Sequence, residues 1–186
     1  MVRIHNNKGI RVLAIAESFE KKDKKSILAG IVMRRDFIVD GLIYGYTTVG
    51  GNDSSDIVLS LVKRLRRNDI NCVMLGGLII SLFNIINGKR INEITGIPVI
   101  GISYKRSIGL KDSIHGINHK QKIQDYFNLD DRKPLTLWTG KTIFIRHWGV
   151  NFSDASNLIN SLVLQGAKPE PLRVANLAAR AHKYYV

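Results

Sequence analysis

The sequence predicts an α/β fold, and three features of its pattern carry that prediction. Apolar, β-branched runs separated by short charged turns come first, the hydrophobic period changes near residue 53 from strand-like to helix-like spacing, and strand and helix patterns then alternate. Short turns join antiparallel neighbours, whereas alternating strands and helices bring parallel strands and crossover helices. We therefore expect a mixed sheet flanked by helices, in a single domain over residues 1–186.

The first half of the chain is expected to begin with three strands, at residues 10–19, 26–34 and 37–48. The stretch "EKKDKKS" reads as a hairpin tip, and "RRD" as the next tight turn. A helix follows in "SSDIVLSLVKRLRRN", which places five apolar residues on one face and offers Ser54 or Asp53 as the N-cap.

The second half alternates. A strand at residues 71–76, a helix in "LFNIINGKRINEIT" and a strand at residues 98–103 come first, then a polar helical stretch at about 107–127. Two short strands, "LTLW" and "KTIFIRHW", and two helices, "SDASNLINSLVLQ" and "PLRVANLAARAHKYY", complete the chain. This order is the layout of a ribonuclease-H-like fold, in which the first and fourth strands pair in parallel. Their carboxyl ends then lie together, which brings Glu17 to the strand end at Gly76 and Gly77.

The charge of the chain points to an anionic partner. Lys and Arg number 28 against 15 for Asp and Glu, which gives a formal net charge of +13 and a pI near 10.0. Such an excess attracts polyanions by counterion release, and nucleic acid, DNA or RNA, is the commonest of them. The alternative is surface lysine kept for solubility.

Composition also bounds the compartment. Apolar residues make up 45% and charged residues 23% of the chain, a globular balance. The one cysteine, Cys72, lies in an apolar run and is expected to be buried and reduced. The N-terminus lacks the pattern of a signal peptide, and no run reaches the ~18 apolar residues of a membrane span. We therefore expect a cytoplasmic protein without a membrane partner; its oligomeric state stays open.

Four stretches resemble a known family. The tail "GAKPEPLRVANLAARA" is similar to the C-terminal signature of the UPF0215 (DUF99) proteins, and "RVLAIAESF", "TVGGNDSSD" and "VMLGGLIISLFNIIN" match in the same order. The resemblance implies an endonuclease-V-like fold of the ribonuclease H type. It also implies a Mg²⁺- or Mn²⁺-dependent endonuclease that acts on DNA containing deaminated bases, deoxyuridine in particular.

The chain departs from that family where acids are expected. The first strand of the family typically has a sequence similar to L-G-I-D-D, and this chain keeps one of its two acids, as Glu17. A later family motif is similar to V-D-G-x-D-A-T, and there this chain keeps Asp53. Four acid positions are replaced, at Ala16, Gly50, Gly76 and Asn87. The alternative function is therefore a catalytically inactive paralogue that serves as a binding or structural protein.

Three carboxylates remain as candidate ligands. Two-metal phosphodiester hydrolysis needs acids from separate elements, which hold cations ~3.5–4 Å apart. Glu17 at a strand end and Asp53 at a helix start are the candidate catalytic residues, and Asp56, one turn on, is a further candidate metal ligand. Each has a plainer alternative, because Glu17 can be a solvated or lysine-paired charge and Asp53 a helix cap.

Four cations are candidate nucleic-acid ligands. Lys105 and Arg106 follow the fifth strand, on the side of the sheet where ligands of α/β proteins collect, and both can bind phosphate. Arg173 and Arg180 are seven residues apart and share one face of the last helix. Surface charge and helix packing are the alternatives.

Overall fold

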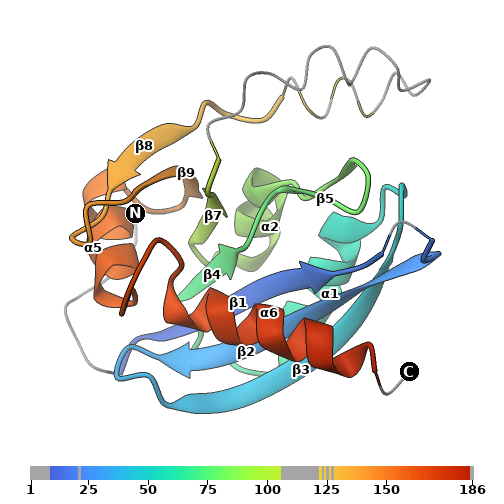
Figure 1. Cartoon of the computed structure of the whole chain (residues 1–186), viewed down its shortest axis with the longest axis horizontal. Coiled ribbons are helices and arrows are strands. Elements are labelled where there is room, and N and C mark those ends of the chain that lie inside the picture. The colour runs from blue at the N-terminus through green and yellow to red at the C-terminus, as the bar shows by residue number, and fades with distance from the viewer. Residues whose placement is uncertain are drawn as a thin grey trace.

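The computed structural model describes residues 9–20, 22–105, 122, 124, 126 and 128–184. Within them, a mixed sheet of seven strands runs in the order β3-β2-β1-β4-β7-β9-β8 (Figure 1). These strands are β1 (Arg11–Ser18), β2 (Lys25–Arg34), β3 (Val39–Thr48), β4 (Cys72–Leu75), β7 (Val99–Ser103), β8 (Lys133–Thr136) and β9 (Thr142–Trp148). A small hairpin of β5 (Ile79–Ile80) and β6 (Asn84–Ile85) lies apart from this sheet.

In the described part of the chain, four helices with complete bounds cover the two faces of the sheet. They are α1 (Ser54–Leu65), α2 (Gly88–Thr95), α5 (Phe152–Ser161) and α6 (Glu170–His182). One core lies between the sheet and α5 and α6, and the other lies on the α1 and α2 side. In Figure 1, α6 crosses the near face of β1 and β2, and α1 lies behind them. No helix among the described residues has the length and apolar character needed to cross a membrane.

The predicted strand pairing is confirmed. β1 pairs with β2 in antiparallel fashion and with β4 in parallel, and β7 continues the parallel set beside β4. The carboxyl ends of β1, β4 and β7 therefore meet along one edge of the sheet, which also holds the start of β2 at Lys25. We call it the carboxyl edge, and the opposite edge the amino edge.

The run "VLAIA" in β1 is continuously apolar because both faces of this strand are buried. Successive side chains of a strand point to opposite faces. Val12, Ala14 and Ala16 accordingly pack on the α5 and α6 side, whereas Leu13 and Ile15 pack on the α1 and α2 side. A substitution in this run therefore changes the packing of only one of the two cores.

The helix expected in "LFNIINGKRINEIT" is shorter than predicted. Ser81, Leu82 and Phe83 have φ angles of 39°, 55° and 68°, a left-handed turn that closes the β5–β6 hairpin. An α-helix cannot pass through such a turn. The helix begins only at Gly88, after Asn87, whose side chain accepts a hydrogen bond from the Arg90 amide.

The start of α5 also differs from expectation. Asn151 caps this helix by accepting a hydrogen bond from the Asp154 amide, so the helix begins at Phe152, one residue before the expected stretch "SDASNLINSLVLQ". The expected helix at 107–127 falls almost entirely outside the described residues; residues 122, 124 and 126 are helical.

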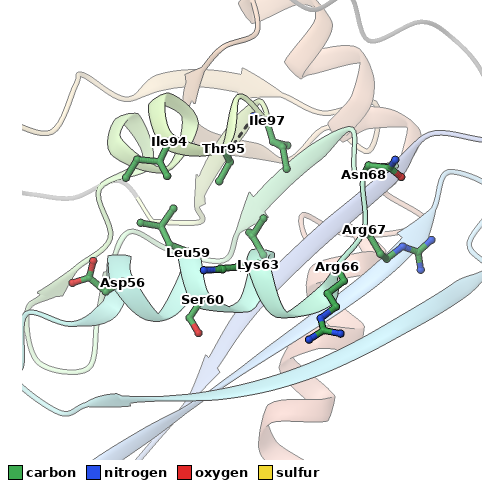
Figure 2. Close-up of a pocket in the computed structure, with 11 residues that line it drawn as sticks. Asp56, Leu59, Ser60, Lys63, Arg66, Arg67, Asn68, Ile94, Thr95 and Ile97 are labelled. Carbon is green, nitrogen blue, oxygen red and sulfur yellow. Dashed lines mark hydrogen bonds between the residues drawn. The ribbon is translucent and has the colours of Figure 1, made fainter.

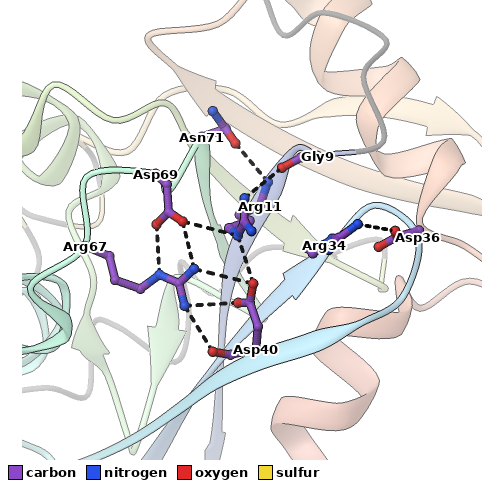
Figure 3. A network of polar contacts seen from close by, with 8 residues as sticks. All are labelled: Gly9, Arg11, Arg34, Asp36, Asp40, Arg67, Asp69 and Asn71. Carbon is purple, nitrogen blue, oxygen red and sulfur yellow. Dashed lines mark hydrogen bonds and ion pairs between the residues drawn. The ribbon is translucent and has the colours of Figure 1, made fainter.

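An ion-pair network closes the amino edge (Figure 3). Arg67, just after α1, pairs with Asp69 at 2.8 Å and with Asp40 at 3.1 Å. Arg11, at the start of β1, pairs with Asp40 at 2.8 Å and with Asp69 at 3.2 Å. The bond from Arg67 lowers the pKa of Asp69. The network ties the end of α1 to the first residues of β1 and β3.

Removing Arg67 tests this tie. Arg67→Ala leaves two neighbouring carboxylates with less compensation, so the free energy of unfolding should fall by about 1–3 kcal/mol. Arg66→Ala is the matched control, because Arg66 is exposed and has no carboxylate partner among the described residues; it should change stability by less than about 0.5 kcal/mol. Chemical denaturation measures both, and equal losses would contradict the role of the network.

Candidate functional site

Glu17 is the last residue but one of β1, and its carboxylate is turned toward the α1 and α2 side of the sheet. Its backbone pairs with Leu28, which belongs to the core on that side. Its Oε1 accepts a hydrogen bond from Ser26 Oγ at 2.6 Å and a second from Ser81 Oγ, and its Oε2 accepts one from the Ser81 amide at 3.3 Å. Strand β2 and the β5–β6 hairpin therefore both donate to this carboxylate.

Asp53 lies at the N-cap position of α1, but its side chain does not cap the helix. Its Oδ1 instead accepts hydrogen bonds from Thr47 Oγ1 at 2.5 Å and Asn84 Nδ2 at 2.7 Å. Thr48 donates from its amide at 3.0 Å and from its hydroxyl at 2.8 Å. The helix-cap alternative is thus wrong for the side chain, which joins the start of α1 to the end of β3.

These bonds stabilise the ionised form of Asp53. Partial burial raises its pKa, but hydrogen bonds from Thr47, Asn84 and Thr48 together lower that pKa from 3.8 to about 2. Asp53 is therefore an anion at neutral pH and stays one in acidic solution until the pH approaches 2.

Small polar side chains link the two acids into one network. Ser26 and Thr47 lie opposite each other in the β2–β3 register, each bonded to one of the acids. The β5–β6 hairpin supplies Ser81 to Glu17 and Asn84 to Asp53. We call these seven residues the carboxylate network: Glu17, Ser26, Thr47, Thr48, Asp53, Ser81 and Asn84.

The donors of this network occupy most of the carboxylate positions that a metal ion would use. A carboxylate offers about four lone-pair positions. Three residues donate to the two oxygens of Asp53, and two residues donate to those of Glu17. Mg²⁺ or Mn²⁺ would have to displace them, and within the part of the chain that the structure describes, no three His, Cys, Asp or Glu side chains gather to hold an ion. The residues present do not fit a Mg²⁺ or Mn²⁺ centre.

The neighbouring strand ends place positions 16 and 76 together, and not 17 and 76. Ile15 pairs with Leu75, so Ala16 lies beside Gly76, and a Cβ added at Gly76 would lie 3.7 Å from that of Ala16. The same Cβ would lie 3.4 Å from Leu172 Cδ2 of α6. The strand ends meet as expected, but the Glu17 side chain points to the opposite face. The pair of positions suited to shared ligation holds an alanine and a glycine.

Asp56 is not brought to the other acids. It is exposed and pairs with Arg90 of α2 at 2.7 Å. Among the predicted cations, Arg173 pairs with Glu170 within α6, which raises the pKa of the arginine.

The other predicted cations differ in what the structure says of them. Lys105 is exposed and follows β7 at the carboxyl edge, as expected. Arg180 is exposed near the end of α6, in a shallow pocket that it shares with Ser18. Arg106 lies outside the described residues.

Cations at the two edges differ in their partners. At the amino edge, Arg11, Arg34 and Arg67 pair with carboxylates. At the carboxyl edge, four exposed cations have no carboxylate partner among the described residues: Lys24, Lys25, Lys105 and Arg180. The uncompensated charge of this edge is positive.

The sequence pattern did not predict the polar members of the carboxylate network. Ser26 and Thr47 are fully buried hydroxyl residues in strand patterns, which is a signal that polar partners exist. Ser81 and Asn84 depend on the hairpin that was predicted as helix. Lys122 was also missed: it is buried, which lowers its pKa, and it donates to the Gly50 carbonyl.

Solved structures define the class of fold. The chain matches a crystal structure of an Archaeoglobus fulgidus protein with a TM-score of 0.81 and 26% identity, over 93% of this chain and 98% of that one. It also matches Ciona intestinalis endonuclease V, solved with a DNA containing inosine, with a TM-score of 0.64 and 13% identity over 95% and 87% of the two chains. Marinitoga piezophila Argonaute matches at 0.54 and 11% identity, over 94% of this chain and 30% of Argonaute. The fold is ribonuclease-H-like.

The particular family follows from the sequence as a whole. Residues 8–182 match the family described as Endonuclease dU. A UPF0215 protein of Pyrobaculum calidifontis is 32% identical over 94% of this chain and 97% of its own length. A UPF0215 protein of Thermoplasma volcanium is 28% identical over 96% and 92%. The chain therefore belongs to the Endonuclease dU family, as the resemblance indicated.

The pKa of Asp53 predicts how stability depends on pH. A lowered pKa stabilises the fold above the unfolded value, near pH 4, and that contribution disappears as the pH falls toward 2. Asp53→Asn should therefore lower the free energy of unfolding at pH 7 by about 1–2 kcal/mol, after allowance for solvent screening, and by much less at pH 2.

Asp56→Asn is the matched control, because Asp56 is an exposed acid on the same helix. It should show little pH-dependent change by denaturation at the same pH values. A loss at Asp53 that is the same at both pH values would contradict the network as the source of its stability.

Proposed function

We propose that this protein binds nucleic acid along its carboxyl edge and does not cut it by the metal-dependent route of its family. The observation that carries the proposal is the state of the two acids: Glu17 and Asp53 are held by hydroxyl, amide and backbone donors. The replaced positions Ala16 and Gly76 support it, since they lie side by side and neither can ligate.

The binding part of the proposal depends on charge. The carboxyl edge holds Lys25, Lys105 and Arg180 without carboxylate partners in the described residues, and the chain as a whole is +13. Phosphate contacts dominate the affinity of proteins for nucleic acid and need no sequence readout. The Ciona endonuclease V structure contains DNA, which is compatible with such a surface on this fold. Arg106 and Arg173 remain predicted contributors.

A second candidate function is the divergent endonuclease, which would cut DNA with deaminated bases, deoxyuridine in particular, using Mg²⁺ or Mn²⁺. One observation favours it. Glu17 Oε2 accepts a single bond, of 3.3 Å, so part of this carboxylate is free for another partner. Asp53 has no comparable free position, because its two oxygens share donors from three residues.

Binding is tested by fluorescence anisotropy with labelled duplex DNA containing deoxyuridine, and with RNA of the same sequence. Affinity should fall steeply with salt, by about 0.9 in the log–log slope for each phosphate contact on duplex DNA. The double variant Lys105→Ala/Arg180→Ala should lower both affinity and slope. Lys63→Ala, at the far end of α1, should lower neither. A salt-independent affinity would contradict backbone-led binding.

Cleavage is tested on the same DNA with Mg²⁺ or Mn²⁺, using wild type and Glu17→Gln. We expect binding without cleavage by both proteins. Cleavage by wild type that is abolished in Glu17→Gln would overturn the proposal and support the second candidate.

A further inference from the structure

A groove of about 850 Å³ lies between α1 and α2, away from the carboxylate network (Figure 2). Its apolar lining comes from Leu59 and Val62 of α1 and from Ile94 and Ile97 at the end of α2. Ile94 is 61% exposed, and the other three apolar lining residues are half-buried. A groove that leaves apolar side chains of two helices accessible to solvent can receive apolar side chains of another molecule.

The ends of the groove differ in charge. At one end, Asp56 of α1 pairs with Arg90 of α2 at 2.7 Å and joins the two helices. At the other end lie Arg66 and Arg67 (Figure 2). Arg67 forms ion pairs with Asp40 and Asp69. Arg66 and the lining residue Lys63 have no carboxylate partner among the described residues. The open charge of the groove is positive.

Arg66 occupies its place at a conformational cost. It caps the C-terminus of α1 with φ 49° and ψ 40°, the left-handed region in which glycine is favoured. A glycine here would end the helix without that cost. The cost is compatible with a use of this arginine side chain in binding.

We propose that this groove binds an acidic, amphipathic segment of a partner protein, with its apolar side chains on the Leu59, Val62 and Ile94 surface and its carboxylates on Lys63 and Arg66. An amphipathic helix laid in an apolar groove is a recurrent mode of peptide recognition. A second copy of this chain is a poor occupant, because each copy is +13. Nucleic acid matches the cations but leaves the apolar surface uncovered.

The groove and the carboxyl edge are separate surfaces. Helix α1 runs from Asp53, in the carboxylate network, to Arg66 at the open end of the groove. Its 12 residues span roughly 18 Å at ~1.5 Å per residue. Both surfaces are therefore available at once, and the groove proposal does not depend on the nucleic-acid proposal.

The test begins with a phage-displayed library of random peptides selected against the immobilised full-length protein. We expect enrichment of sequences that combine Asp or Glu with apolar residues at helical spacing. The best sequence is then synthesised with a fluorescent label, and its affinity is measured by anisotropy. Enriched peptides that lack acidic residues would overturn the proposal.

Variants locate the peptide and separate binding from folding. Ile94→Glu should weaken the peptide about tenfold or more, the loss expected from placing a like charge in an apolar contact. Arg66→Gly should weaken it several-fold while raising the melting temperature, a combination that a folding defect cannot produce. Lys105→Ala, at the carboxyl edge, is the control and should bind the peptide like wild type. Unchanged peptide affinity in Ile94→Glu would overturn the proposal.

The same variants exclude a nucleic-acid role for the groove. Duplex DNA should bind Lys63→Ala and Arg66→Gly as tightly as wild type. If both variants lose DNA affinity to the same extent as Lys105→Ala/Arg180→Ala, the groove belongs to the nucleic-acid surface and the peptide proposal fails.

Discussion

The strict alternation of side chains along β1 is the constraint on which the arrangement of the two cores and of the candidate site depends. β1 lies between β2 and β4, with both faces buried, so each of its residues is committed to one of two cores. Ala16 faces α6 and lies beside Gly76, whereas Glu17, one residue on, faces the β5–β6 hairpin. One step along the strand separates a place suited to paired carboxylates from a place where a carboxylate is hydrogen-bonded to serine.

Under the proposed function, that separation lets this fold hold acids without a metal site. Glu17 and Asp53 join β2, β3 and the start of α1 through Ser26 and Thr47, and both accept hydrogen bonds from the β5–β6 hairpin. The hydrogen bonds that stabilise the ionised form of Asp53 also stabilise the folded state. Charge differs between the two edges, since Arg11, Arg34 and Arg67 at the amino edge pair with carboxylates, whereas Lys25, Lys105 and Arg180 at the carboxyl edge have no carboxylate partner among the described residues.

Much of this architecture could be predicted from the sequence, because hydrophobic period reports burial directly. The three leading strands, the parallel pairing of the first and fourth strands and the position of α1 all followed from it. The β5–β6 hairpin did not, since it depends on the left-handed backbone at Ser81–Phe83, residues with no glycine to signal the turn. The carboxylate network was not predicted for the same reason, because the hairpin places Ser81 and Asn84 beside the two acids. The facing of Glu17 could have been predicted from alternation in β1, had the register with β4 been applied to side chains as well as strand ends.

We propose that positions 16 and 76, and not position 17, form the place in this fold where paired carboxylates would hold a metal ion. Mn²⁺ binding measured by electron paramagnetic resonance tests it most directly, with wild type and the double variant Ala16→Asp/Gly76→Asp compared at equal protein concentration. The account predicts that wild type leaves the Mn²⁺ signal unchanged and that the double variant removes free Mn²⁺ stoichiometrically. Tight Mn²⁺ binding by wild type that is lost in Glu17→Gln would contradict it.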